Sequence, residues 1–128
     1  TAASFEWGYH EDEVGRAVAQ TGMRDSVFIQ TKVRIKSDKS VRQSVLACLE
    51  RLGIAQVDAV LIHKPEGDWI AGWRELEDLY NEGRVRAIGV SDMNVALLSL
   101  LMSKSREPPM ILQNWMDPFH HDTGVREY

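Results

Sequence analysis

The sequence DAVLIH at residues 58–63 is nearly continuous in apolar residues. Such a run is typical of a strand that is buried on both faces, as in a parallel sheet. Residues 69–82 then place apolar side chains at helical spacing, Gly83 marks the end of that helix, and RAIGV at 86–90 indicates the next strand. This order predicts a βαβ unit, in which two parallel strands are joined by a right-handed crossover.

The same alternation extends to both sides of this unit. Three further helices are expected at 11–21, from a cap at Ser37 through Leu52, and from a cap at Asn94 through Met102, with a short last helix from Thr123. Two further strands are expected at 27–33 and 110–114. The fold class is therefore α/β with about four parallel βα units. Alternation alone fits either an open doubly wound sheet or part of a (β/α)8 barrel.

Composition excludes several other classes of protein. The 128 residues are 44% hydrophobic and 27% charged, with a net charge of -4 and one cysteine, which is close to a globular average. No apolar run reaches the length of a membrane span, and mild acidity disfavours a nucleic-acid surface, so neither partner is expected. The chain has no G-x-G-x-x-G motif, no P-loop and no C-x-x-C pair. No targeting segment is visible, so a cytoplasmic location is the default expectation.

Polar side chains stand at the end of each predicted strand. They are Lys32, His63, the pair Ser91 and Asp92, and the pair Gln113 and Asn114, each about one βα unit after the last. The carboxyl ends of parallel strands meet at one edge of a sheet, where ligands bind. Each residue alone is as well explained by an exposed or capping role. Together, a lysine, a histidine and amide groups predict a site that polarises a carbonyl and holds an amide of a cofactor.

Other polar clusters are interpreted structurally. The carboxylates at 11–13 fit the first turn of a helix, where they favour the positive end of the helix dipole. His120 and His121 are adjacent in a loop without a suitably spaced third ligand, so no metal site is expected. Cys48 lies on the apolar face of its helix and is interpreted as packing.

Several stretches together resemble the aldo-keto reductase family. They are Thr1-Ala2-Ala3, EVGRA at 13–17, FIQTK at 28–32, SVLACLERLGIAQVD at 44–58, LIHKP at 61–65, WRELEDLYNEGRVRAIGVS at 73–91, and Gln113-Asn114. They occur in the family's order and spacing over essentially the whole chain. The resemblance implies a (β/α)8 barrel rather than an open sheet. It also implies an oxidoreductase that uses NADPH, or less often NADH, to reduce small aldehydes and ketones.

The family's catalytic tetrad consists of Asp, Tyr, Lys and His, and the resemblance places Lys32 and His63 in the last two roles. The aspartate would directly precede Thr1, and the tyrosine that protonates the carbonyl oxygen is replaced by Phe5. Phenylalanine has no proton to give. Tyr9, in the same loop, is the possible substitute acid.

The resemblance also implies a nicotinamide site. Ser91 and Gln113 match the family's ligands of the nicotinamide amide, while Asp92 stands where the family has asparagine. Aspartate accepts hydrogen bonds but cannot donate one, which weakens the match. Trp7 and Trp115 are expected to line an apolar substrate pocket.

These departures leave an alternative function open. Phe5 and Asp92 favour a protein that binds a cofactor or partner without efficient turnover. A complete (β/α)8 barrel needs about 250 residues. Residues 1–128 are therefore expected to be a single incomplete domain, the central part of a barrel, that is inactive when isolated. The sequence does not indicate an oligomeric state.

Overall fold

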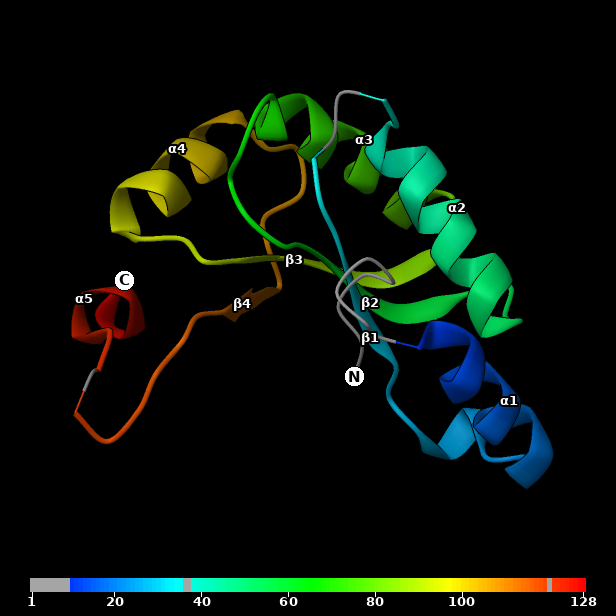
Figure 1. The fold of residues 1–128 in the computed structure, drawn as a ribbon. Helices are drawn as coiled ribbons and strands as arrows, with labels where there is room; N and C mark the ends of the chain where they lie inside the picture. Colours follow the sequence, from blue (N-terminus) through cyan, green and yellow to red (C-terminus); the bar gives the residue numbers. More distant parts are fainter. Residues whose placement is uncertain (1–9, 36–37, 120) are drawn as a thin grey trace.

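The computed structural model describes residues 10–35, 38–119 and 121–128 (Figure 1). Its helices are α1 (Glu11–Thr21), the short 3-10 helix η2 (Arg24–Ser26), α2 (Val41–Leu52), α3 (Trp69–Asn81), α4 (Val95–Lys104) and α5 (Thr123–Glu127). Its strands are β1 (Gln30–Val33), β2 (Val57–Ile62), β3 (Val85–Ser91) and β4 (Ile111–Gln113). Among the residues described, no helix has both the length and the apolar character needed to cross a membrane.

The four strands form one parallel sheet in the order β1-β2-β3-β4. Each neighbour in the sheet is thus the next strand in the chain, as the predicted βα repeat requires. Lys32 pairs in register with Leu61, Leu61 with Gly89, and Gly89 with Ile111. Because side chains of register partners share a face, this row runs across the whole sheet on one side. The predicted alternation of strands and helices is confirmed.

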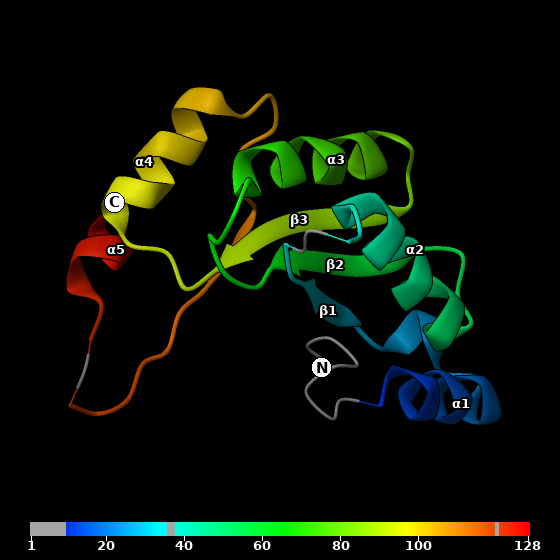
Figure 2. The same ribbon diagram turned by 45° about the horizontal axis from the view of Figure 1, so that its top comes forward.

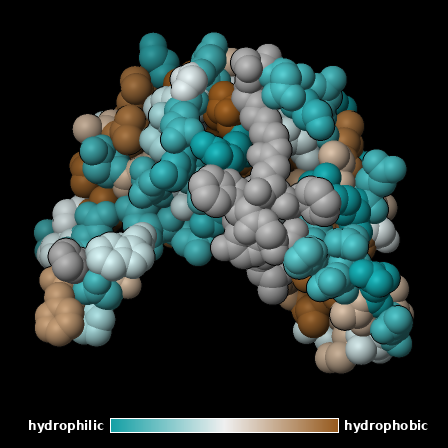
Figure 3. Space-filling view, viewed as in Figure 1, coloured by the Kyte–Doolittle hydropathy of each residue, from teal (hydrophilic) through white to brown (hydrophobic). Residues whose placement is uncertain are grey.

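The sheet is curved, and the molecule has the outline of an arch. In Figures 1 and 2, α2, α3 and α4 cover the convex side of the sheet, while α1 and α5 lie at opposite ends of the arch. The space-filling view in Figure 3 shows the same outline, with the hollow of the arch between its two limbs. The concave side therefore corresponds to the inside of a barrel wall.

Helix and strand boundaries differ from the sequence prediction by a few residues. The second long helix begins at Val41 and is capped by Ser40, whose side chain accepts from the backbone N–H of Gln43 in a capping box. The predicted cap, Ser37, lies outside the described residues. The first strand begins at Gln30 rather than residue 27, because η2 runs to Ser26 and the pairing with β2 starts only at Gln30. Asn94 caps α4 as predicted.

The hydrophobic core lies between the sheet and the helices on its convex side. Trp73, Leu76 and Leu79 of α3 are buried against this face of the sheet together with Val60 and Ile88. Removing such apolar surface from water drives folding, at about 2 kcal/mol for each large side chain. The core thereby fixes the direction in which all four strand ends point.

Asp58 ties together the amino-terminal ends of three strands. Its carboxylate accepts from the backbone N–H of Ile29 at 2.8 Å and pairs with Arg24 at 2.9 Å and Arg86 at 3.3 Å. Burial alone would raise the pKa of Asp58, but the Ile29 hydrogen bond and the two guanidinium groups outweigh it and lower that pKa. The buried carboxylate is thus ionised and fully paired.

Glu77 in α3 fixes the segment that leads into β4. Its carboxylate accepts from Trp73 Nε1 at 3.1 Å, from the backbone N–H of Arg106 at 2.6 Å and of Glu107 at 2.9 Å, and from Arg106 Nε at 2.9 Å. Burial opposes ionisation, yet these hydrogen bonds lower the pKa of Glu77. A side chain that is 0% exposed therefore carries a charge, and both of its carboxylate oxygens are hydrogen-bonded.

Glu11 forms a third buried network, which local sequence pattern does not indicate. It lies in the first turn of α1 as expected, but it is also buried, accepts from Thr31 of β1 and pairs with Arg51 of α2. Its main role is therefore to hold α1 on the sheet rather than to complement a helix dipole. Cys48 lies beside this network, where burial and the Glu11 carboxylate raise its pKa to about 12. This agrees with its interpretation as packing.

Candidate active site

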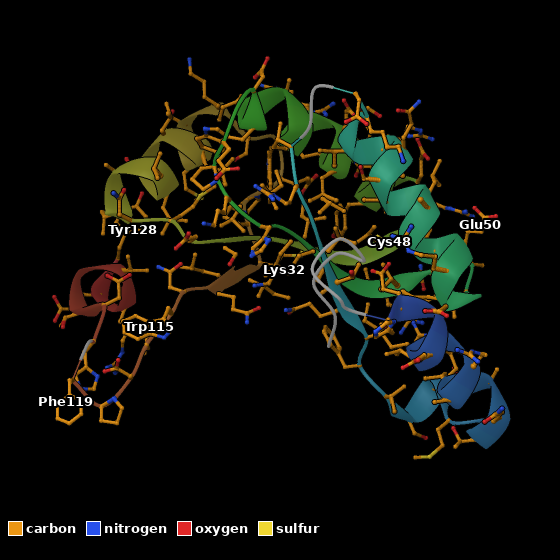
Figure 4. All side chains as sticks on the ribbon, viewed as in Figure 1. Lys32, Cys48, Glu50, Trp115, Phe119 and Tyr128 are labelled. Atoms are coloured by element: carbon orange, nitrogen blue, oxygen red, sulfur yellow. The ribbon has the colours of Figure 1, made fainter. Side chains whose placement is uncertain are left out.

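The carboxyl-terminal ends of the four strands form the candidate site, called here the rim and defined by Lys32, His63, Ser91, Asp92 and Gln113. These five residues line one cavity of about 410 Å³, together with Asn114, Trp115 and Met116. The sequence predicted each of the five from its place after a strand. The structure thus brings all of them together. It also places Lys32 near the centre of the arch in Figure 4.

Lys32 and Ser91 are in direct contact across the rim. Lys32 Nζ donates to Ser91 Oγ at 3.2 Å, and Ser91 Oγ donates to the backbone carbonyl of Gln113 at 2.7 Å. Burial lowers the pKa of Lys32, and the negative charge of Asp92 partly opposes that effect. The ammonium is consequently held beside hydroxyl and amide groups, where it can polarise an oxygen brought into the cavity.

His63 follows β2 and faces the same cavity. Its backbone N–H donates to Val33 at 2.8 Å, which fixes where the side chain begins. Burial and the positive charges of Lys32, Arg34 and Lys64 lower the pKa of His63. Its Nδ1 atom is buried and has no hydrogen-bond partner in the described part of the chain. A neutral imidazole with an unused nitrogen is suited to orienting a polar ligand.

Asp92 has an unusual backbone conformation. It has a φ of 62°, the left-handed region that Asp and Asn adopt more readily than most residues. Asn114 holds the next residue in place, because its side chain accepts from the Met93 N–H at 3.1 Å and donates to the Met93 carbonyl at 2.7 Å. Asp92 also lies 3.8 Å from Lys64, with both side chains about half exposed. The loop after β3 is thereby fixed to the end of β4.

Two further side chains of the site were not assigned a role from the sequence. Gln30 of β1 donates to Gln113 Oε1 of β4 at 2.8 Å. Asn114 also donates to Asp122 at 2.8 Å, which connects the rim to the start of α5. The sequence analysis names Asn114 among the polar residues at the strand ends, but its contacts with Met93 and Asp122 are not visible in the sequence. Gln30 could not be found from its position, since it stands at the start of its strand.

Of the two tryptophans that were predicted to line the pocket, Trp115 lies in the described part of the chain and Trp7 does not. Trp115 lines the cavity and is 70% exposed, while Phe119 stands farther along the same loop (Figure 4). Phe5, Trp7 and Tyr9 lie outside the described residues. The proton donor and the second tryptophan therefore remain predictions.

A metal site was not expected, and the described ranges contain no group of three or more His, Cys, Asp or Glu side chains that could hold a metal ion. His121 Nε2 lies 3.1 Å from the Pro118 carbonyl, and His120 is outside the described residues.

The aldo/keto reductase family model matches residues 1–128. The chain is 35% identical over 133 residues to a glyoxal reductase of Bacillus subtilis, covering 100% of this chain and 47% of that protein. It is 31% identical over 134 residues to a 2,5-diketo-D-gluconic acid reductase B of Corynebacterium sp., with the same coverage of 100% and 47%. The chain thus spans about half the length of the curated relatives it matches.

Solved structures show the same relationship. An aldo/keto reductase from Brucella melitensis superposes with a TM-score of 0.87 at 30% identity, covering 98% of this chain and 52% of that one. A Bombyx mori aldo-keto reductase in complex with NADP gives a TM-score of 0.78 at 27% identity, covering 91% and 43%. The predicted family resemblance and the predicted partial barrel are both confirmed, and the open sheet is excluded.

Proposed function

Because the chain belongs to the aldo/keto reductase family, we propose that it carries part of the active site for NADPH-dependent reduction of a small aldehyde or ketone to an alcohol. The observation that supports this most strongly is the cavity at the rim, where Lys32, His63, Ser91, Asp92 and Gln113 meet. The neighbours that hold NADP or NADPH support the choice of cofactor.

The chemistry of the rim fits a nicotinamide group. When bound, a reduced nicotinamide supplies a hydride, and its carboxamide offers both a hydrogen-bond donor and an acceptor. Asp92 provides a carboxylate acceptor, and Gln113 provides an amide. Both line the cavity, and they come from adjacent strand ends. Ser91 completes the set by holding the Gln113 backbone in place.

The carbonyl of the substrate would lie against Lys32 and His63. Burial and nearby cations lower the pKa of His63 and so favour its neutral form, in which one ring nitrogen can donate a hydrogen bond to the carbonyl oxygen and the other is an acceptor. Lys32 places a positive charge where negative charge develops on that oxygen. Tyr9 is proposed as the group that delivers the proton, in place of the hydroxyl that Phe5 lacks.

We also propose that residues 1–128 form part of one barrel domain rather than a self-sufficient unit. Within the described residues, β1 and β4 each have a strand neighbour on one side only. A barrel wall needs further strands along both of those edges. The isolated 128 residues should accordingly show neither turnover nor tight binding of NADPH.

The test uses the complete reading frame that encodes this chain, with NADPH consumption followed in the presence of a nitrobenzaldehyde. Lys32→Met should lower the rate about 10²- to 10⁴-fold. The matched control is Lys104→Met, at an exposed lysine that ends α4. A failure of the unaltered protein to bind NADPH would refute the proposal. Binding without turnover would instead support the non-catalytic function that Phe5 favours.

The identity of the acid has a separate test. Tyr9→Phe should abolish reduction while NADPH still binds, because only the proton donor is lost. Tyr128→Phe is the control, since that tyrosine is exposed and distant from Lys32 in Figure 4. Unchanged turnover in Tyr9→Phe would show that the proton comes from another group.

A further inference from the structure

The hydrogen bond between Gln30 and Gln113 joins the two outer strands of the four-stranded sheet. Gln30 begins β1 and Gln113 ends β4, with β2 and β3 between them. Their side chains nevertheless meet at 2.8 Å. The register partners of Gln30 across the sheet are Ala59 and then Ala87, whose small side chains leave room on this face. The curvature of the sheet (Figure 1) allows the contact, and Gly89 of β3, which lies in the row between those of Gln30 and Gln113, adds no side chain to this face.

The bond occupies the oxygen of the Gln113 side-chain amide. Gln30 Nε2 donates to Gln113 Oε1. Because the oxygen and the nitrogen of a side-chain amide point in different directions, this leaves Gln113 Nε2 available to another partner. Gln113 is thus presented to the cavity as a donor.

Apart from Lys32, the polar side chains around Gln113 have little capacity to donate. The one hydroxyl proton of Ser91 is used by the Gln113 carbonyl. The amide hydrogens of Asn114 are used by the Met93 carbonyl and by Asp122. Asp92, as a carboxylate, only accepts. Gln113 and Asp92 therefore form a pair of opposite hydrogen-bonding character.

We propose that Gln30 is a positioning residue that fixes this polarity, so that Gln113 Nε2 donates to the oxygen of the nicotinamide carboxamide and Asp92 accepts from its NH2 group. The inference rests on the proposed function, because it concerns how that same site holds its cofactor. It also explains how aspartate serves at position 92. Since the donor is supplied by Gln113, the residue at 92 needs only to accept.

The test inverts the polarity with Gln30→Glu and measures the dissociation constant of NADP+ by calorimetry, using the complete reading frame at about pH 8, where a glutamate is ionised. Glu at position 30 has no hydrogen to donate, so Gln113 must turn its Nε2 toward it and leave Oε1 facing the cavity. Gln113 Oε1 and the Asp92 carboxylate then both face the carboxamide as acceptors. Its NH2 group can donate to them, but its oxygen is left without a donor. The affinity for NADP+ should fall about tenfold.

The decisive variant combines Gln30→Glu with Asp92→Asn. Asn at position 92 can donate to the carboxamide oxygen while the turned Gln113 accepts from the NH2 group, so the inverted site is again complementary. Asp92→Asn alone should weaken NADP+ about threefold, because a charge-assisted bond becomes a neutral one. The double variant should return to that threefold level instead of the roughly thirtyfold loss that independent effects would give.

Gln20→Glu, alone and combined with Asp92→Asn, is the matched control. Gln20 is an exposed residue of α1, so Gln20→Glu changes the net charge as Gln30→Glu does but leaves the Gln30–Gln113 contact intact. Gln20→Glu should leave NADP+ binding unchanged. Thermal melting of every variant checks that the fold is intact.

Two outcomes would overturn the inference in distinguishable ways. If the unaltered protein binds no NADP+, the proposed function fails and this inference fails with it. If NADP+ binds but Gln30→Glu has no effect, or Asp92→Asn does not restore its binding, only the polarity assignment is wrong.

Discussion

The two ends of the sheet differ in how completely their polar groups are paired. At the amino-terminal ends, Asp58 uses its whole carboxylate on Ile29, Arg24 and Arg86. At the carboxyl-terminal ends, the rim has a buried His63 nitrogen without a partner among the described residues. It also has a left-handed Asp92 and a cavity of about 410 Å³.

This difference separates the residues that hold the fold together from those that are available to a ligand. A buried charge with every hydrogen bond satisfied contributes to a defined structure and has nothing left to offer a ligand. A rim with unused donors and acceptors gains partners only when something binds. Substitutions at the amino-terminal ends should therefore change stability, and substitutions at the rim should change binding and turnover.

The largest effect on stability is expected for Glu77→Gln, which alters the satisfied network before β4. An amide places hydrogens where Arg106 donates, so the free energy of unfolding should fall by about 3 kcal/mol. Urea unfolding of the protein encoded by the complete reading frame measures this change. Glu50→Gln, at an exposed position on the outer side of α2 in Figure 4, is the control and should be neutral. A neutral Glu77→Gln would contradict the structural role of this network.

Asp58→Asn should cost about 2 kcal/mol, because the amide keeps one acceptor for Ile29 but leaves Arg24 without its counter-charge. The lowered pKa of Asp58 also predicts the direction in which the free energy of unfolding changes with pH. The stabilisation is present above the unfolded-state pKa of about 3.9 and is lost as pH falls through the folded-state value. Asp25→Asn, an exposed neighbour in η2, is the control. A matching loss of NADP+ affinity in Asp58→Asn would break the proposed division between the two ends.

Lys32→Met should change the free energy of unfolding by less than about 1 kcal/mol, even though it should remove turnover. Burial already disfavours the charged form of Lys32, as its lowered pKa shows. Replacing the ammonium by an apolar group of similar length thus removes a cost of folding. Chemical unfolding of the Lys32→Met and Lys104→Met variants side by side checks this. A loss as large as that of Glu77→Gln would assign Lys32 to the fold rather than to the site.

The smallest effect is expected for the contribution of His63 to the pH dependence of folding stability. Its pKa is lowered in the folded state, so the unfolded chain binds more protons once pH falls below about 6.5. The folded state should therefore lose stability as pH is lowered through that range, and His63→Gln should reduce this loss. Unfolding curves at several pH values measure the difference, with His121→Gln as an exposed control. An identical pH dependence in both variants would contradict the lowered pKa of His63.

The sequence predicted the rim because its members share one simple rule of position. Lys32, His63, Ser91 and Gln113 each lie at or next to the carboxyl end of a strand, and parallel strands bring such ends to the same edge. The alternation of strands and helices was predictable for the same reason, since apolar periodicity is local.

Contacts between distant segments could not be predicted in this way. The partners of Asp58 and Glu77 lie about one βα unit away, and their pairing depends on how helices pack on the sheet. Glu11 was placed correctly in a helix but not in its buried pair with Arg51. The Gln30–Gln113 bond joins the two outer strands and depends on the curvature of the whole sheet (Figure 1).

The most direct test of the central claim is a nuclear magnetic resonance titration of the histidine ring signals with NADP+, in the complete reading frame. His63 is identified by the signal missing from His63→Gln. If the rim holds the nicotinamide, the His63 signal shifts and saturates with NADP+, while the signal of His121 stays in place. Saturable binding of NADP+ that leaves the His63 signal unmoved would place the cofactor elsewhere and contradict the account.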